Sequence, residues 1–344
     1  MKVIGACVAI LLVFEGVIRF LIGVPRMEYL PLLRVQPDPK FGYAPVPGDQ
    51  HYGYDEFITL NSLGLRGAEV SSKGPDEYRM LVFGGTQVYG LGIPDAGLFT
   101  NVLEDHLNHD DHVRTYRVMN FGVRAFSLQQ QLNFLEMVGV AVEPDHVMVV
   151  LDMYSMGEMD IEAFYMRVKA RDWYMLDLDA KPERRALVKW YMVQAARKSA
   201  LVAWLHSLHK HWTQRQGLTA KVMRGEKDAK TEKWVRFVAR QVEAFASMAK
   251  TYRFSLSFAL LPFPSDVSGE QHTRRYRTQL QDIVTSRGFR FFDLQEPLRA
   301  LYEQAGRLPV APFDGHYNAA AHEAIALFLL ESLREPNTLS EGSS

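Results

Sequence analysis

The stretch Arg79-Met80-Leu81-Val82-Phe83-Gly84-Gly85-Thr86 decides the fold of this 344-residue chain. A short apolar run that ends at a glycine pair is typical of a buried strand followed by a sharp turn. Four further apolar runs lie at residues 117–121, 146–153, 254–261 and 289–294, mostly with helical patterns between them. Near-continuous apolar strands that alternate with helices predict a parallel sheet covered on both faces. We therefore expect a three-layer α/β/α domain.

The composition excludes several classes of protein. The chain is 47% hydrophobic and 23% charged, and its 39 Lys and Arg nearly balance its 40 Asp and Glu. This balance argues against a surface that coats nucleic acid, so we expect no nucleic-acid partner. The single cysteine, Cys7, excludes an internal disulfide framework and a cysteine-based metal site. The neighbouring His206, His209 and His211 have no acidic or thiol companion nearby, so we expect no metal and no cofactor.

Residues 3–24 are almost wholly apolar and are interrupted only by Glu15 and Arg19. A helix of this length is about 33 Å long, which matches the hydrocarbon core of a bilayer. Glu15 and Arg19 are four residues apart, so they share one helix face and can neutralise each other. We expect residues 1–24 to be a membrane anchor in contact with lipid. The alternatives are a buried core helix and a cleaved signal peptide, although a good cleavage site does not follow the apolar run.

The rest of the chain divides by composition. Residues 25–75 are rich in proline, glycine and tyrosine and predict an extended stalk with two short strands, the second at 56–60. Residues 76–334 carry the strand and helix alternation. Between its third and fourth strands lies a long insertion, about residues 155–240, which contains all five tryptophans. Residues 335–344 form a polar tail that we expect to be disordered.

The insertion has its own chemistry, because residues 184–225 contain no Asp or Glu. Aromatic residues recur there at helical spacing with basic residues between them, a pattern typical of contact with a membrane surface or an anionic partner. The residues that we expect to make this contact are Trp190, Trp204, Trp212, Arg184, Arg185 and Lys189. The alternative is a plain helical cap on the sheet with a solvated basic side.

Four stretches place glycines beside hydroxyl, amide or imidazole side chains near predicted strands or the last helix. They are Asn61-Ser62-Leu63-Gly64-Leu65-Arg66-Gly67, Gly84-Gly85-Thr86, Asn120-Phe121-Gly122 and Asp314-Gly315-His316. Together they resemble the sequence blocks of the SGNH (GDSL-like) hydrolases, and in particular of their bacterial membrane-anchored branch. The resemblance implies a flavodoxin-like, SGNH-hydrolase-type sheet. It also implies a single-pass protein of the bacterial inner membrane with most of the chain in the periplasm.

The resemblance implies a chemistry as well: an esterase or O-acyltransferase that acts on acyl esters of cell-envelope glycans. In that case Thr86 would be the nucleophile, His316 the base and Asp314 the carboxylate that orients it. The backbone amides of Thr86 and Gly122 would bind the oxyanion. The alternative for the last block is that Asp314 caps the final helix and His316 is a half-buried loop residue.

The departures from the family pattern point to a different function. The family has serine at the position of Thr86 and aspartate at that of Gly85, and the asparagine that follows its third strand is missing from residues 151–157. Losing one oxyanion donor costs on the order of 10²–10³ in turnover. Asp152, at the end of that strand, is explained more simply by hydrogen bonds from loop amides than by catalysis. We therefore favour a catalytically degenerate scaffold or accessory subunit that binds a membrane complex through the insertion, with the esterase or O-acyltransferase as the alternative.

Overall fold

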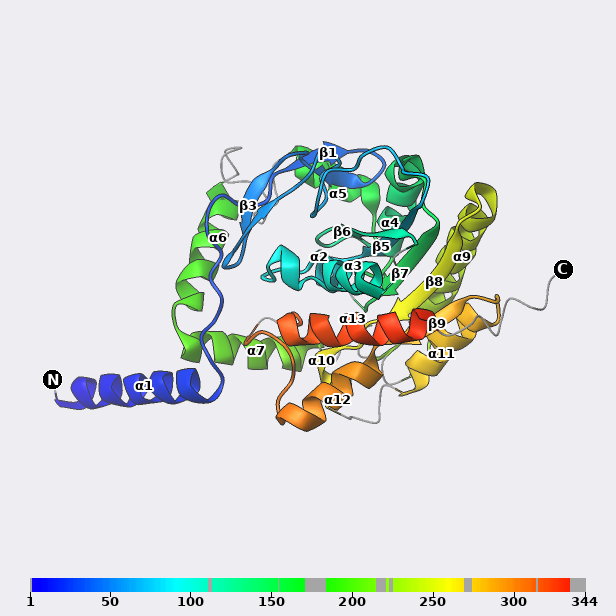
Figure 1. Cartoon of the computed structure of the whole chain (residues 1–344). Coiled ribbons are helices and arrows are strands. Elements are labelled where there is room, and N and C mark those ends of the chain that lie inside the picture. The colour runs from blue at the N-terminus through cyan, green and yellow to red at the C-terminus, as the bar shows by residue number, and fades with distance from the viewer. Residues whose placement is uncertain are drawn as a thin grey trace.

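The computed structural model describes residues 2–110, 113–153, 155–170, 184–214, 221–222, 225–268, 274–313 and 315–334. Its centre is a parallel sheet of five strands in the order β6-β5-β7-β8-β9 (Figure 1). The strands are β5 (Glu77–Gly84), β6 (Thr115–Gly122), β7 (His146–Leu151), β8 (Ser255–Leu260) and β9 (Arg290–Asp293). All five correspond to the apolar runs in the sequence. Numbered along the chain the order is 2-1-3-4-5, the flavodoxin-like order, so the expected fold class is confirmed.

Helices cover both faces of the sheet, because side chains alternate along each strand. Met80 and Val82 of β5 pack toward one face, and Leu81 and Phe83 pack toward the other. The first face is covered by α3 (Phe99–Asp110), α12 (Gln295–Ala305) and α13 (Ala319–Arg334). The second face is covered by α4 (Leu128–Phe134), α9 (Ala229–Tyr252) and α11 (Arg274–Thr285). Shorter turns connect these layers: α2 (Thr86–Tyr89), α10 (Pro264–Val267), η1 (Asp95–Gly97), η2 (Leu135–Gly139) and η3 (Val140–Val142).

Residues 25–75 pack against the sheet domain rather than forming an extended stalk, and the strand expected at 56–60 is present as β4 (Glu56–Thr59). The segment forms two antiparallel hairpins, β1 (Val35–Asp38) with β2 (Gly42–Pro45), and β3 (Gln50–Gly53) with β4 (Glu56–Thr59). Phe41 and Tyr43 are buried in the same cluster as Phe126 of the sheet domain. A solvated stalk would leave these aromatic rings in water, and their burial provides the free energy that folds the segment against the domain.

The described part of the insertion is helical, as expected. It contains α5 (Ile161–Lys169), α6 (Arg184–Arg197) and α7 (Ala200–Gln214), which precede α9. In Figure 1, α6 runs along one side of the molecule from the hairpins toward α7.

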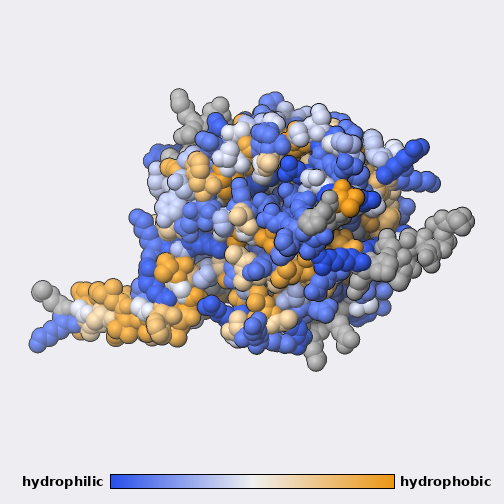
Figure 2. Space-filling view, viewed as in Figure 1, coloured by the Kyte–Doolittle hydropathy of each residue, from blue (hydrophilic) through white to orange (hydrophobic). Residues whose placement is uncertain are grey.

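The N-terminal helix α1 (Lys2–Leu21) projects from the body of the molecule (Figure 1). Among the described residues it is the one helix long and apolar enough to cross a membrane. Its apolar side chains are mostly exposed and form a continuous hydrophobic surface in Figure 2. A core helix would be buried, so α1 fits a membrane anchor or a signal sequence.

Candidate active site

Thr86 lies where the direction of the sheet connections reverses. Strand β5 has β6 on one side and β7 on the other, and the chain turns into α2 at Thr86 directly after β5. In open parallel sheets, ligands bind in the crevice outside the carboxyl ends of the strands at such a switch point. Thr86 is partly exposed there. The turn at the glycine pair therefore leaves the Thr86 side chain at the carboxyl end of β5.

The Thr86 hydroxyl is held by a strained loop. Its Oγ1 accepts a hydrogen bond of 3.1 Å from the backbone N–H of Ala125, in the loop that follows β6. Ala125 has a φ of 61°, which lies in the left-handed region that L residues with a side chain rarely adopt. Such a conformation costs on the order of 1–3 kcal/mol and persists only where its surroundings enforce it. Sequence reasoning missed Ala125, because an alanine carries no signal of backbone strain.

The Gly122 amide, which the resemblance assigns to the oxyanion, is hydrogen-bonded inside the fold. It donates to Asn120 Oδ1 at 2.9 Å, and Asn120 Nδ2 donates to the carbonyl oxygen of Val88 at 2.7 Å. A Cβ on Gly122 would collide with the backbone of Val88 and Tyr89, so glycine here lets α2 pack directly on the end of β6. The role that the structure supports for Asn120 and Gly122 is to seat α2.

A buried carboxylate lies beside the glycine pair. Asp152 follows β7, and its Oδ1 accepts a hydrogen bond of 3.1 Å from the Ser155 amide, as expected for a loop-capping residue. Its Oδ2 would lie 3.2 Å from a Cβ on Gly85. The Ser155 hydroxyl donates back to the Asp152 carbonyl oxygen at 3.0 Å. Where the resemblance implies a neutral amide donor, this chain therefore presents a carboxylate and a serine hydroxyl that is already engaged.

Gln87, the residue after Thr86, holds the loop at residues 315–317 by two hydrogen bonds. Its Nε2 donates to the Gly315 carbonyl oxygen at 3.3 Å, and its Oε1 accepts from the Tyr317 amide at 3.2 Å. His316, between these two residues, is half-buried, and its ring meets the Tyr54 ring edge-on at 6.1 Å between centroids. The loop that carries His316 is thus held beside α2. Within the described residues no hydrogen bond joins Thr86 to His316, and Asp314 lies outside the described residues.

Arginines from distant parts of the chain surround Tyr54. The guanidinium carbons of Arg26 and Arg197 lie 5.7 and 5.2 Å from the centre of its ring, which is a cation–π arrangement. Arg197 also lies 3.4 Å from the buried carboxylate of Glu28, and Arg124 lies 3.6 Å from it. Because Arg197 ends α6, the insertion reaches the edge of the candidate site. Sequence reasoning missed Tyr54 and Glu28, which belong to the segment expected to be a stalk.

The stretch 61–67 supports the loop after α2. The buried Arg66 guanidinium donates to the carbonyl oxygens of Tyr89, Gly90 and Ile93 at 3.0, 2.7 and 2.8 Å. Asn61 Oδ1 accepts hydrogen bonds from two amides of its own turn. The role that the structure supports for this stretch is to clamp the first block in place.

A buried chain of polar groups joins the second hairpin to α2. The Tyr89 hydroxyl lies 2.6 Å from His51 Nε2, and His51 Nδ1 lies 3.0 Å from Asp49 Oδ2. Burial lowers the pKa of His51. Burial alone would raise the pKa of Asp49, but hydrogen bonds from His51 and Arg34 outweigh it and the pKa is lowered. These groups hold the end of α2 against the second hairpin. They are too deeply buried to contact a substrate.

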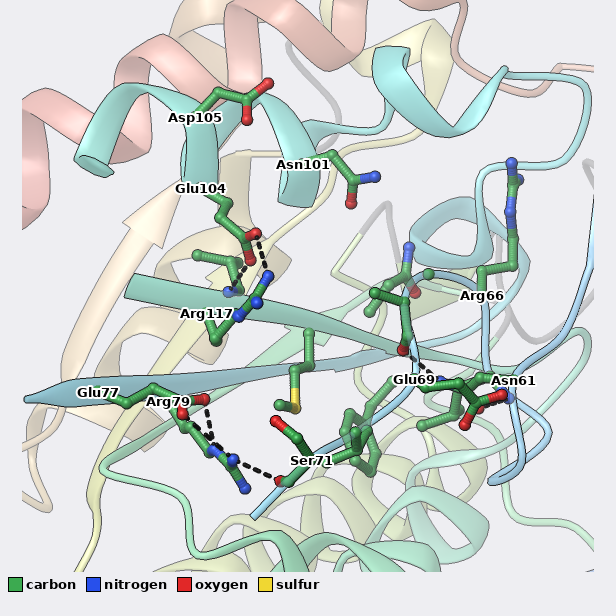
Figure 3. Close-up of a pocket in the computed structure, with 18 of the residues that line it drawn as sticks. Asn61, Arg66, Glu69, Ser71, Glu77, Arg79, Asn101, Glu104, Asp105 and Arg117 are labelled. Atoms are coloured by element: carbon green, nitrogen blue, oxygen red, sulfur yellow. Dashed lines mark hydrogen bonds and ion pairs between the residues drawn. The ribbon is translucent and has the colours of Figure 1, made fainter. Parts of the chain in front are cut away.

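A cavity of about 200 Å³ lies away from Thr86, between residues 61–71, α3 and β6 (Figure 3). Most of its charged side chains pair with one another or with the backbone. Arg79 donates to Glu77 and to the Ser71 carbonyl oxygen, and Glu104 accepts from the Val118 amide at 2.7 Å. Burial raises the pKa of Glu104. The cavity is smaller than most ligand pockets, and we interpret it as a gap beneath the clamp.

The insertion residues expected to contact a membrane or partner have different positions. Trp190 is only 6% exposed and packs against Tyr191, so it cannot form a contact surface. The reason is that helical spacing does not tell which face of a helix packs inward. Arg184 is exposed and Trp204 is partly buried. The side chains of Trp212, Arg185 and Lys189 lie outside the described residues, so their roles stay predictions.

No family model matches the chain, and no curated protein matches it. Among solved structures it is similar to a lipolytic G-D-S-L family protein from Veillonella parvula, with 12% identity over 74% of this chain and 97% of that chain and a TM-score of 0.42. The α/β hydrolase LAE5 from the metagenome of Lake Arreo is 11% identical over 76% of this chain and 96% of its own, with a TM-score of 0.46. A catalytic mutant of Axe2, an acetylxylan esterase from Geobacillus stearothermophilus, is 12% identical over 78% of this chain and 97% of its own, with a TM-score of 0.43. Because the sequence identities and TM-scores are this low, a function for this chain has to be argued from its own residues.

Proposed function

We propose that the protein is a membrane-anchored, extracytoplasmic scaffold or accessory subunit with an SGNH-hydrolase-like domain that does not turn over an ester. The observation that carries this proposal is the buried Asp152 carboxylate beside Gly85, at the place where the resemblance implies a neutral oxyanion donor. Ester hydrolysis passes through an intermediate whose oxygen is negatively charged and needs N–H donors. An ionised carboxylate beside that oxygen would oppose the development of its negative charge.

Two further contacts support the loss of turnover. The Gly122 amide donates to Asn120 rather than toward a bound oxygen. The methyl group of Thr86 restricts the rotation of the hydroxyl that would attack, and the hydroxyl is already held by the Ala125 amide. A scaffold needs neither an open oxyanion site nor a mobile nucleophile, so these features are compatible with a binding protein.

The binding role would belong to the helical insertion. Its helix α6 extends from the exposed Arg184 to Arg197, which packs over Tyr54 at the edge of the site. The insertion therefore reaches from an exposed arginine to the edge of the sheet domain, where an accessory subunit could contact both its partner and the site. An envelope glycan is the other binding partner compatible with the resemblance.

One observation favours a second candidate, an esterase or O-acyltransferase that acts on acyl esters of envelope glycans. The two hydrogen bonds of Gln87 hold the His316 loop beside the helix that begins at Thr86. In that reaction Thr86 Oγ1 would bond to the ester carbonyl carbon while His316 takes the hydroxyl proton. His316 would then give this proton to the departing alcohol, and water or an acceptor hydroxyl would release the acyl group.

A fluorophosphonate probe separates the two functions. We expect the full-length protein in detergent to remain unlabelled. The double variant Thr86→Ser with Asp152→Asn removes the methyl group and the carboxylate together, and we expect it to gain labelling that depends on His316. Labelling of the wild-type protein that disappears in both Thr86→Ala and His316→Ala would contradict the scaffold. If the double variant also stays unlabelled, the Asp152 carboxylate is not what prevents the reaction, and its position beside Gly85 no longer supports the proposal.

A further inference from the structure

Glu15 of the apolar helix α1 caps a helix that follows it by more than 180 residues. Its carboxylate accepts hydrogen bonds from the Ser199 hydroxyl at 2.7 Å and from the backbone amides of Ala200 and Leu201 at 2.8 and 2.9 Å. These two amides are the first of α7 (Ala200–Gln214). A carboxylate at a helix N-terminus satisfies amides that have no partner within the helix and interacts favourably with the helix dipole.

Arg19 completes this contact. Its Nε donates to Glu15 Oε1 at 2.6 Å, and its Nη2 donates to the Lys198 carbonyl oxygen at 2.7 Å. A charged pair within an apolar helix is costly in a bilayer unless its hydrogen bonds are made inside the protein. Here the carboxylate accepts four hydrogen bonds from the protein, so water is not required to solvate it.

The position of Glu15 along α1 sets the depth of α7. The 20 residues of α1 give a length of about 30 Å, equal to the hydrocarbon thickness of a bilayer. Glu15 lies six residues before the end of α1 at Leu21, or about 9 Å below it. The part of α1 before Glu15 is only about 20 Å long and is too short to span by itself. If α1 crosses the membrane, the first turns of α7 lie inside the outer leaflet beside it.

The exposed side chains of α7 suit that position. Val202, Leu205 and Leu208 are 43%, 53% and 47% exposed. Each lies three residues after the one before, so the series winds around the helix by about 60° at each step. The exposed His206 and His209 lie among these apolar side chains. Figure 1 draws α1 and α7 along nearly the same direction, with α7 leading away from the outer end of α1 toward the body of the molecule. An exposed face that mixes apolar side chains with histidines, and that continues from a spanning helix, suits the boundary between acyl chains and headgroups.

We propose that the first two turns of α7 enter the outer leaflet of the bilayer against α1, so that Val202 contacts acyl chains, Leu205 lies at their outer boundary and Leu208 lies among the headgroups. This inference rests on the membrane anchoring in the proposed function and adds a second membrane-contacting element to it. It also makes α1 a permanent part of the fold, because removal of α1 would leave the first amides of α7 without their cap.

The lone cysteine allows a direct test. In a Cys7→Ala background, single cysteines at positions 11, 202, 205 and 208 are labelled with an environment-sensitive fluorophore, with exposed Met137 as the aqueous control. The full-length protein is placed in phosphatidylcholine–phosphatidylglycerol vesicles that contain quenchers at the headgroup or deep in the acyl chains. We expect deep quenching at 11, acyl-chain quenching at 202, less at 205, headgroup quenching alone at 208, and none at 137.

Each other pattern overturns one claim. Quenching at 11 together with a signal at 202 equal to that at 137 rejects the insertion of α7 and leaves the anchor intact. Equal quenching at 202, 205 and 208 means that α7 lies flat on the surface, which contradicts the proposed depth gradient. The absence of quenching at 11 rejects the anchor itself.

Glu15→Leu tests the cause of the insertion. This substitution makes α1 more apolar, so the spanning helix stays in the bilayer, but it removes the acceptor of the Ala200 and Leu201 amides and leaves only the Ser199 hydroxyl, which accepts from the Val202 amide, as a side-chain cap of α7. We expect acyl-chain quenching at 202 to fall at least twofold while quenching at 11 is unchanged. Leu12→Ala, on the same helix but at an exposed apolar position, is the matched control and should preserve the gradient. An unchanged signal at 202 in Glu15→Leu would show that the cap does not hold α7 in the membrane.

Discussion

Replacing Gly85 by aspartate, the residue that the family has at this position, should destabilise the protein because Asp152 already occupies the neighbouring space. A Cβ at residue 85 would lie 3.2 Å from Asp152 Oδ2, so the new carboxylate would lie on the order of 4 Å from the existing one. At an effective dielectric constant of 20, two unit charges at 4 Å repel by about 4 kcal/mol.

Proton uptake limits this cost and gives it a pH dependence. Holding an aspartate with an ordinary pKa of about 3.9 in its protonated form costs about 4 kcal/mol at pH 7 and about 1.5 kcal/mol at pH 5. In Gly85→Asp the pair of carboxylates has a raised pKa in the folded state, so the folded protein binds more protons than the unfolded chain. The penalty is therefore largest at pH 7 and shrinks as the pH falls toward 5.

Urea unfolding of the full-length protein in detergent, followed by tryptophan fluorescence at pH 7 and pH 5, measures both effects. Gly85→Asn is the matched control, with the same size and no charge, and should cost about 1–3 kcal/mol at either pH from crowding alone. Adding Asp152→Asn to Gly85→Asp should recover most of the difference between the two substitutions. If Gly85→Asp and Gly85→Asn destabilise equally at pH 7, the two carboxylates do not meet and the geometry of the site is not as described.

Two further predictions concern the backbone beside Thr86 and the buried histidines. Ala125→Gly should raise the free energy of unfolding by about 0.5–1 kcal/mol, because glycine adopts a φ of 61° without strain; an unchanged or lower urea midpoint would argue against strain at Ala125. Burial lowers the pKa of His146 to about 4 and that of His322 to about 3, from an unfolded value of 6.5, so stability should be lost as the pH falls from 6.5 to 4. Each histidine should contribute about 3 kcal/mol to this loss, since the unfolded state binds a proton that the folded state does not. His146→Gln, which can still bond the Ser257 hydroxyl, should remove about half of the combined pH dependence of the urea midpoint, and a midpoint with the wild-type pH dependence would contradict a neutral buried His146.

The sheet could be predicted from the sequence because each of its strands is an uninterrupted apolar run, and burial on both faces imposes that pattern. The placement of Thr86 followed from the glycine pair that ends β5. The contact between Asp152 and Gly85 could not be predicted in the same way. Asp152 meets Gly85 because β5 and β7 are neighbours in the sheet although β6 lies between them in the chain, and single-sequence patterns do not encode strand order.

The packing of residues 25–75 against the sheet domain could not be predicted for a related reason. The strand expected at 56–60 is present, but the other strands of its hairpins have only four residues, too few for a period-2 pattern to be recognised among prolines and glycines. Tyr43 and Tyr54 were visible in the sequence, but an aromatic ring in a glycine-rich segment does not tell whether it is solvated or packed. What decides this is the surface that receives it, and that surface belongs to distant parts of the chain, such as Phe126 and His316.

The two charged residues of the apolar N-terminal helix begin a series of contacts that reaches the candidate site. Glu15 and Arg19 bind the turn between α6 and α7, and Arg197 in the last turn of α6 packs on Tyr54, whose ring touches His316. Contacts therefore run without a break from the outer part of α1 to the edge of the candidate site. If α1 spans the membrane, as the proposed function holds, these contacts would keep the site at a fixed height and orientation above the bilayer, which suits a subunit that docks within a membrane complex.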